Sequence, residues 1–388
     1  MIARILAEKA LQLYKQFPAL MITGPRQSGK TTLIKSLFSE LPYVSFEEPD
    51  VRERAKNDPR NFLKNYPNGA IFDEIQRVPD MFSYLQSVID ADETVHFVLS
   101  GSQHFLLLEQ VTQSLAGRVA ILQLLPLSLI EMKNAQIPLS TIEQTLYFGG
   151  FPRIFNQNIA PYDFYSAYMQ TYIERDVRLL QQINNLDLFV RFTRLCAGRV
   201  GQLLNLHSLA TDAGVSSTTA QAWLSILKAS HIVFTLQPHH KNFNKRLVKT
   251  PKLYFTDTGL ACHLLGIEKA EQINTHFLKG GLFENLIILE LLKNRYNKGK
   301  KSNLYFWRDN HGHEVDCLIE NLDQLLPIEI KSSETTNYGF FDGLRYWNNL
   351  SEENKKLGVV VFGGDNSAVT ASGNYISWRE LDKFLNLD

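Results

Sequence analysis

Cysteine is scarce in this sequence, and a net charge is absent. The 388 residues include three cysteines, Cys196, Cys262 and Cys317, which form no CxxC pair. Disulfide frameworks and structural zinc sites need paired cysteines, so this spacing indicates neither. Forty basic and forty acidic residues cancel. The whole-chain charge therefore predicts no binding to polyanions, and any basic surface must be local.

Long apolar runs are absent as well. The most apolar stretch, VAILQLLPLSLI, is interrupted by Gln123 and Pro126 and is too short to span a bilayer. The N-terminal stretch MIARILAEKALQLYKQF carries charges throughout and lacks the apolar core of a secretion signal. We therefore expect no membrane association and a location in the reducing cytoplasm. A content of 44% hydrophobic and 21% charged residues is typical of a globular protein, here long enough for two or three domains.

The sequence does contain a phosphate-binding motif. Residues 24–31 fit GxxxxGK(S/T), between an apolar run, PALMIT, and a segment with helical spacing, KTTLIKSLF. Gly24 and Gly29 allow backbone N–H groups to face phosphates at the start of a helix, where Lys30 reaches the β- and γ-phosphates and Thr31 binds Mg²⁺. The alternative, a chance glycine loop, is disfavoured by this strand–loop–helix context. The residues predicted to bind the nucleotide are Gly24, Pro25, Arg26, Gln27, Ser28, Gly29, Lys30, Thr31, Thr32 and Ser102.

Two further strand ends carry polar groups. In GAIFDEIQRVPD, Asp73 and Glu74 follow the apolar run Ala70-Ile71-Phe72. Phosphoryl transfer needs a carboxylate on the metal, for which Asp73 is suited, and a group that activates water, for which Glu74 is suited. The run VHFVLSGS ends in Ser100 and Ser102, which could sense the γ-phosphate or simply cap a helix.

Taken together, these segments resemble a known family. GPRQSGKTTL, IFDEIQRVPD, VLSGSQ and SLAGRVAILQLLPLS are similar to prokaryotic AAA-type P-loop ATPases whose core is fused to a C-terminal domain of unknown function, and the resemblance continues through GGFPRI and YIERDV. It implies ATP and Mg²⁺ as cofactors. Strand and helix alternation from Leu20 to Pro126 independently predicts a doubly wound α/β domain with a parallel sheet.

An arginine that stabilises developing negative charge is expected near the nucleotide. Arg118, in LAGR, is the first candidate, in cis or from a neighbouring copy in a homo-oligomer, and a surface charge is the alternative. Arg175, in ERDVR, is a weaker candidate, since its acidic neighbours favour surface ion pairs.

The middle of the chain predicts a basic winged helix. Residues 203–239 read as a helix, a turn at Gly214, a second helix and a strand, and KLYFTD gives another strand. From Ala213 to Thr256 there is no Asp or Glu, which predicts a local DNA-binding face. The alternative is a winged helix used for packing or protein contacts, whose basic loop is only a solvated rim. The predicted DNA contacts are Lys228, Lys241, Lys245, Arg246, Lys249 and Lys252.

The last third predicts a nuclease-like α/β core. Its order is a helix (GGLFENLIILELLKN), three strands (NLYFWRD, HEVDCLIE, LLPIEIKSS), a helix and a strand. Asp316 followed by IEIK resembles the PD-(D/E)xK restriction-endonuclease-like fold, although Val315 replaces the proline. That resemblance implies Asp316, Glu329 and an outer Glu284 as metal ligands, with Lys331 as a catalytic group. A surface ion pair, or a fold retained only to dock DNA, are the alternatives.

Four regions follow from these patterns: an ATPase core (1–135), a helical lid or linker (136–195), a winged helix (196–270) and a nuclease-like domain (271–388). We expect an ATP-hydrolysing protein coupled to a DNA-facing, nuclease-like C-terminal half. A nucleotide-switched regulator that does not cleave DNA is the main alternative, and a protein-interaction module is a third.

Overall fold

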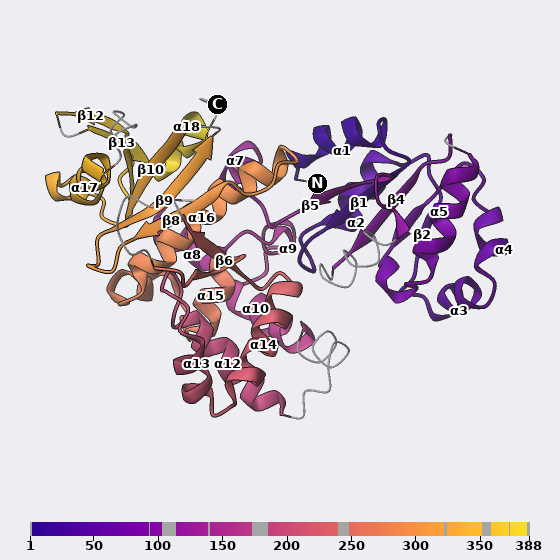
Figure 1. Cartoon of the computed structure of the whole chain (residues 1–388), viewed down its shortest axis with the longest axis horizontal. Helices are drawn as coiled ribbons and strands as arrows, with labels where there is room; N and C mark the ends of the chain where they lie inside the picture. Colours follow the sequence, from indigo (N-terminus) through magenta and orange to yellow (C-terminus); the bar gives the residue numbers. More distant parts are fainter. Residues whose placement is uncertain are drawn as a thin grey trace.

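The computed structural model describes residues 2–92, 94–102, 114–138, 140–172, 185–239, 248–321, 324–350, 358–371 and 373–385. Figure 1 shows an N-terminal sheet with its helices at one end, a C-terminal sheet at the other, and a helical unit below and between them. Helices α7 and α16 lie where the two ends meet.

The N-terminal part is a parallel sheet covered by helices on both faces. Its strands run in the order β2-β3-β4-β1-β5, and every pair is parallel, which confirms the predicted doubly wound core. All five residues of β1 are buried, as expected for a parallel strand covered on both sides. The elements are α1 (Leu6–Tyr14), β1 (Ala19–Thr23), α2 (Lys30–Leu37), β2 (Tyr43–Ser45), α3 (Pro49–Asn57), α4 (Pro59–Lys64), β3 (Ile71–Asp73), η1 (Ile75–Arg77), α5 (Met81–Ala91), β4 (Phe97–Gly101) and β5 (Val119–Gln123).

The apolar core of this part has two halves, one on each face of the sheet, because side chains along a strand alternate between the faces. Leu20 and Ile22 of β1 pack with α1 and α2 on one face, whereas Ala19 and Met21 pack with α3, α4 and α5 on the other. Successive residues of a strand point to opposite faces, so a single apolar strand supplies both halves of the core. The sheet is thereby held rigidly beneath the phosphate-binding loop.

The middle part is mainly helical. Gly214 ends α13 in the left-handed conformation (φ 77°), and Ser216 caps α14, which confirms the predicted pair of helices around that turn. The elements are α7 (Leu129–Asn134), α8 (Ile142–Phe148), α9 (Pro152–Asn156), α10 (Pro161–Tyr172), α12 (Leu186–Ala197), α13 (Leu206–Ala213), α14 (Ser217–Ala229), β6 (Val233–Pro238), β7 (Lys252–Phe255), α15 (Thr258–Leu264) and η3 (Ala270–Thr275).

The C-terminal part contains the predicted helix–three strands–helix–strand order and two short strands that the sequence did not indicate, β12 and β13. Helix α17 packs on one face of the sheet and α16 on the other. The elements are α16 (Lys279–Asn297), β8 (Leu304–Arg308), β9 (Glu314–Asn321), β10 (Gln324–Lys331), η4 (Tyr338–Phe341), α17 (Asp342–Leu350), β11 (Val359–Phe362), β12 (Ala368–Thr370), β13 (Gly373–Ser377), η5 (Trp378–Glu380) and α18 (Leu381–Leu385).

The middle and C-terminal parts share one sheet. Its order is β12-β13-β11-β10-β9-β8-β6-β7, and β6 pairs in parallel with β8 through Gln237–Tyr305 and Pro238–Phe306. The strands expected to form a separate wing therefore extend the C-terminal sheet. The assignments of a winged helix and of a restriction-endonuclease-like fold stay predictions.

Candidate nucleotide-binding site

The phosphate-binding loop connects β1 to α2 in the conformation that its glycines allow. Gly24 has φ 145°, and a Cβ there would lie 2.1 Å from the carbonyl oxygen of Leu124. Gln27 (φ 60°) and Gly29 (φ 97°) also have positive φ. Gly29 is the residue at the start of α2, so the free N–H groups of that helix open toward the loop.

The lysine of the motif lies over its own loop. Lys30 is buried, and its Nζ donates hydrogen bonds to the carbonyl oxygens of Gly24 (2.9 Å) and Pro25 (2.8 Å). These bonds hold the ammonium group beside the cradle that the loop forms. The side chain is therefore placed where it can exchange carbonyl partners for phosphate oxygens.

Asp73 accepts hydrogen bonds from hydroxyl groups on three elements. Its carboxylate accepts hydrogen bonds from Thr31 Oγ1 (2.9 Å) and the Tyr43 hydroxyl (2.7 Å), and from Ser100 Oγ. Since β4 lies between β1 and β3, Ser100 sits between the loop strand and the aspartate strand. Carboxylate and hydroxyl oxygens are the ligands that Mg²⁺ prefers, so Thr31 and Asp73 fit the metal that a P-loop implies.

Glu74 is held next to this centre. It adopts the left-handed backbone region (φ 56°), which is unusual for a residue other than glycine and is found at functional sites. Its carboxylate accepts a hydrogen bond from the Gln76 amide and lies 3.4 Å from Ser102 Oγ. The structure thus brings Glu74 and Ser102 together, and it adds Gln76 and Tyr43, which no sequence pattern had indicated.

An open cavity of about 670 Å³ connects these residues with two helices beyond the core. Pro152, Arg153 and Asn156 of α9 and Thr171 of α10 line it together with the phosphate-binding loop. These residues of α9 and α10 belong to the region 136–195, which was predicted to be a helical lid or linker. Arg153, whose Nε donates to Gln157 Oε1 (2.8 Å), is therefore a cationic side chain of the site that the sequence analysis missed.

A second cavity, of about 250 Å³, adjoins the loop on its other side. It shares Gly29, Thr32, Pro152 and Asn156 with the first cavity. Its remaining walls are mostly apolar and come from the N-terminal segment and α2: Ile2, Ala3, Arg4, Ala7, Leu33, Ser36 and Leu37.

The structure does not bring Arg118 to this site. Arg118 directly precedes β5, whose first residue pairs with Ala19 at the start of β1, whereas the loop follows the end of β1. Arg118 instead forms an ion pair with Asp90 near the amino-terminal ends of the strands, whereas the phosphate-binding loop lies at their carboxyl-terminal ends. A role in cis therefore does not agree with the fold, and a role in a neighbouring copy stays a prediction. Arg175 lies outside the described residues.

The structure describes three of the six residues predicted to contact DNA. Lys228 and Lys249 are exposed, and Lys241, Lys245 and Arg246 lie outside the described residues. Lys252 requires a correction: although β7 is the edge strand of the sheet, its side chain is only 3% exposed, because the ammonium group is bonded to carboxylates of α16 and β9. It cannot serve as a surface contact to a phosphate.

Lys252 lies instead among the carboxylates that the sequence analysis assigned to the nuclease-like site. Its Nζ is 2.8 Å from Glu284 Oε1 and 3.9 Å from Asp316 Oδ1, and it also forms an ion pair with Glu314. Lys331 is 2.5 Å from Glu329 Oε1 and 3.9 Å from Asp316 Oδ2. The four predicted residues do converge, together with Lys252 and Glu314.

The side chains of this cluster do not fit a metal ion. Among the described residues, no group of three or more His, Cys, Asp or Glu side chains is arranged to hold one, and the ammonium group of Lys252 bonds with carboxylates that would have to face a cation. Burial raises the pKa of Glu284 to about 7 against the opposing charge of Lys252. Burial and then Asp316 raise the pKa of Glu329 to about 8. The assignment of Glu284, Asp316 and Glu329 as metal ligands stays a prediction, which this charge pairing disfavours.

A loop after the first strand of a parallel sheet, with its threonine bonded to an aspartate two strands away, defines the class of this domain as a P-loop nucleotide-binding domain. Residues 16–133 match the AAA domain family, which agrees with that class. Residues 139–271 and 279–381 match two domains of unknown function, DUF8612 and DUF4143.

The chain is 30% identical over 324 residues to uncharacterized proteins of Mycobacterium tuberculosis and Mycobacterium bovis, covering 82% of this chain and 71% of each relative. It is 24% identical over 349 residues to an uncharacterized protein of Methanocaldococcus jannaschii, covering 81% of this chain and 75% of that protein. The chain belongs to the family of these mycobacterial proteins and carries an AAA domain followed by the two domains of unknown function.

Two solved structures show partial similarity. A Walker-type ATPase of Pyrococcus abyssi is 13% identical, covers 68% of this chain and 96% of its own, and has a TM-score of 0.44. DnaA from Aquifex aeolicus bound to AMPPCP is 14% identical, covers 57% of this chain and 86% of its own, and has a TM-score of 0.30. Because both TM-scores are low, the fold assignment depends on the sheet order and the loop. No helix in the described ranges is long and apolar enough to cross a membrane.

Proposed function

We propose that this protein binds and hydrolyses ATP with Mg²⁺ and that its nucleotide state controls the C-terminal half. The observation that carries the proposal is the hydrogen bond from Thr31 Oγ1 to Asp73 Oδ2 (2.9 Å). This bond supports the proposal because it joins, next to the phosphate-binding loop, two oxygen groups of the kind that Mg²⁺ prefers.

Each residue of the site has a distinct task in this proposal. The backbone N–H groups at the start of α2 bind phosphate oxygens, and Lys30 leaves its carbonyl partners to bind the β- and γ-phosphates. Mg²⁺, when bound, neutralises charge on the phosphates. Glu74, oriented by Gln76 and Ser102, accepts a proton from the attacking water.

The second cavity is suited to a purine base. Apolar side chains of Ile2, Ala7, Leu33 and Leu37 line it, and it meets the phosphate site at Gly29, where a bound nucleotide would pass from base to phosphates. Planar rings are commonly held by such apolar walls with few polar groups. Arg153, in the same cavity as Lys30 and Glu74, is the candidate within this chain for stabilising charge on the γ-phosphate.

Three variants test this function. Lys30→Ala is expected to weaken MgATP binding at least tenfold, measured with a fluorescent ATP analogue, because it removes the phosphate contact. Glu74→Gln is expected to bind MgATP normally but to release phosphate at least about 100-fold more slowly, as loss of a general base does. Glu53→Gln, on the exposed face of α3, is the control. Normal phosphate release by Glu74→Gln would exclude its role, and a wild-type protein without MgATP affinity would contradict the proposal.

A second candidate function is DNA docking without cleavage by the C-terminal half. Two observations support it: the stretch from Ala213 to Thr256 lacks acidic residues, and α13 and α14 are joined by a short turn at Gly214, as the two helices of a helix-turn-helix are. The ammonium group of Lys252 among the carboxylates argues against a metal-dependent nuclease.

Binding to fluorescent single-stranded and duplex DNA tests this function. Wild-type affinity is expected to fall steeply with salt, and a Lys245→Ala/Arg246→Ala/Lys249→Ala variant is expected to lose most of it. Lys56→Ala, exposed on α3, is the control. DNA incubated with Mg²⁺ or Mn²⁺ is expected to stay intact. Cleavage that disappears in Lys331→Ala would restore the nuclease prediction, and salt-independent or absent binding would exclude DNA as the partner.

A further inference from the structure

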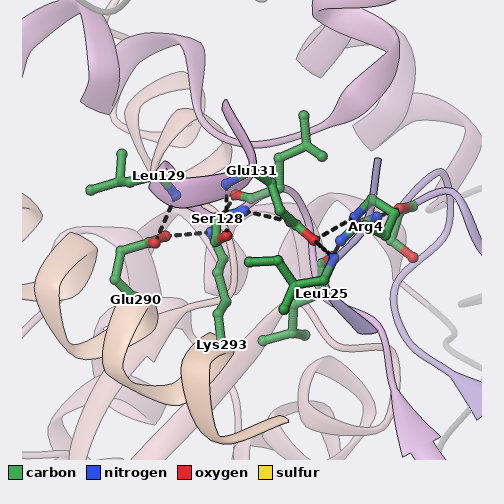
Figure 2. Close-up of polar contacts among 10 residues, drawn as sticks. Arg4, Leu125, Ser128, Leu129, Glu131, Glu290 and Lys293 are labelled. Carbon is green, nitrogen blue, oxygen red and sulfur yellow. Dashed lines mark hydrogen bonds and ion pairs between the residues drawn. The ribbon is translucent and has the colours of Figure 1, made fainter. Parts of the chain in front are cut away.

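A buried ion pair joins the N-terminal segment to α7. Arg4 Nε is 3.0 Å from Glu131 Oε1, and the two side chains are 6% and 1% exposed. Figure 2 shows this pair at the centre of a chain of polar contacts. Because breaking a buried ion pair leaves an uncompensated charge, the two residues hold each other firmly in place.

The guanidinium group of Arg4 also contacts the phosphate-binding loop. Its Nη1 donates to the carbonyl oxygen of Ser28 (2.6 Å) and its Nη2 to that of Leu125 (2.6 Å). Ser28 directly precedes Gly29 and α2, so Arg4 holds the back of the loop whose N–H groups face the phosphates. The planar guanidinium can reach the loop, the segment after β5 and Glu131 at once, which a lysine cannot do.

Glu131 also forms hydrogen bonds with residues at the start of α7. Its Oε1 accepts a further hydrogen bond from the N–H of Ile5 (2.8 Å). Its Oε2 accepts one from the N–H of Ser128 (2.9 Å), while Ser128 Oγ accepts one from the N–H of Glu131. This capping box fixes the turn that begins α7.

The same turn is bonded to the C-terminal half. Glu290 Oε2 accepts a hydrogen bond from the N–H of Leu129 (2.8 Å), and Lys293 Nζ donates to the carbonyl oxygen of Leu127 (2.8 Å) and to Glu290 Oε1 (2.8 Å). Glu290 and Lys293 are both buried and belong to α16. That helix also carries Glu284 of the Lys252 cluster.

Nucleotide binding would act on this series of contacts where it reaches the phosphate-binding loop. Ser28 is fully buried, yet its Oγ has no hydrogen-bond partner among the described residues. When Lys30 exchanges the carbonyl oxygens of Gly24 and Pro25 for phosphate oxygens, the loop loses two internal hydrogen bonds, and the same loop carries the Ser28 carbonyl that Arg4 holds. A shift of that carbonyl therefore acts directly on Arg4.

We infer that Arg4 and Glu131 are positioning residues that couple nucleotide occupancy of the P-loop to helix α16. Arg4 sets the loop for phosphate binding, and Glu131, through the 127–129 turn, carries the change to Glu290 and Lys293. This inference rests on the proposed MgATP binding. It requires reciprocity: a change at Glu290 must alter the affinity for MgATP, although Glu290 lines neither cavity of the nucleotide site.

Hydrogen exchange of the full chain, with and without saturating MgATP, tests the coupling. In wild type, MgATP is expected to change exchange rates within residues 279–297. In Glu131→Gln, which keeps the shape but not the charge, this change is expected to fall at least twofold, with an MgATP dissociation constant about tenfold higher. The matched control is Glu143→Gln, which breaks the ion pair of α8 with Lys279 of α16 (2.6 Å) outside the Arg4–Glu131 chain. It is expected to leave both quantities as in wild type.

Glu290→Gln gives an independent test should Glu131→Gln not fold. It is expected to raise the dissociation constant for MgATP several-fold. The inference is overturned if Glu131→Gln and Glu290→Gln, folded by circular dichroism, respond to MgATP as wild type does, or if Glu143→Gln loses the response equally. A wild-type protein that binds no MgATP would instead overturn the proposed ATP-dependent function.

Discussion

Lys252 shows how one side chain can decide the character of a site. Three carboxylates surround its ammonium group, and burial raises the pKa values of two acids in the cluster, Glu284 and Glu329, to about 7 and about 8. Where a divalent cation would have to bind, the fold supplies its own cation. Lys252 therefore neutralises the buried carboxylates and stabilises the folded protein.

Lys252→Met is expected to destabilise the protein by about 3 kcal/mol or more, since it leaves buried carboxylates without their partner. The effect should grow with pH. The raised pKa of Glu284 means that the folded state keeps a proton that the unfolded state releases near pH 4.5. Stability therefore falls as pH rises from about 4.5 to about 7, and loss of Lys252, which opposes the shift, raises this pKa further.

Thermal unfolding at pH 5 and pH 8 measures this, with Lys249→Met, an exposed lysine, as the control. Equal behaviour of the two variants at both pH values would show that the Lys252 ion pairs contribute nothing to stability.

At the scale of elements, the phosphate-binding loop depends on close contact between β1 and the segment after β5. The N–H of Leu124 donates to the carbonyl oxygen of Thr23 (2.8 Å), and Gly24 passes so near that a Cβ would lie 2.1 Å from the Leu124 carbonyl oxygen. The loop is therefore shaped by its neighbouring strand as much as by its own sequence.

Gly24→Ala is accordingly expected to displace the loop and to weaken MgATP binding at least tenfold, together with a lower midpoint of thermal unfolding. Gly214→Ala is the matched control. Gly214 has a positive φ of 77° with no atom within 4 Å of an added Cβ. The Gly214→Ala substitution is therefore expected to cost only about 1 kcal/mol of backbone strain and to leave nucleotide binding intact. A Gly24→Ala protein with wild-type affinity for MgATP would show that the close approach is not needed.

At the scale of the whole molecule, the AAA domain and the C-terminal sheet meet at α7 and α16 (Figure 1). The contacts there are buried hydrogen bonds and ion pairs between segments far apart in sequence, such as Leu129 with Glu290. A junction of this kind has defined geometry, and a change on one side is transmitted to the other when it alters those bonds.

The sequence predicted the core well because its signals are local. An apolar strand, a glycine loop and a helical spacing lie within about twenty residues, and a second apolar strand directly precedes Asp73 and Glu74. The structure brings Thr31, Asp73 and Glu74 to one cavity. Lys252 could not be placed in the same way. Its burial depends on the pairing of β6 with β7 and with β8, and a strand's environment follows from such distant pairing rather than from its own residues.

Other partners were missed for the same reason. Arg4 and Glu131 are 127 residues apart, and Arg153 belongs to a segment whose glycines indicated only a break in the helix. No spacing rule connects such residues, since their contact is a product of how the parts are packed.

The shared sheet has a consequence for how this family evolves. The two domains of unknown function meet between residues 271 and 279, but β6 and β8 pair across that boundary. A fragment that begins at residue 279 would leave the edge of β8 open to other chains and would lose Lys252 while keeping Glu284, Glu314 and Asp316. Recombination at that boundary would separate two regions that share one sheet, so we expect relatives to carry the two regions together.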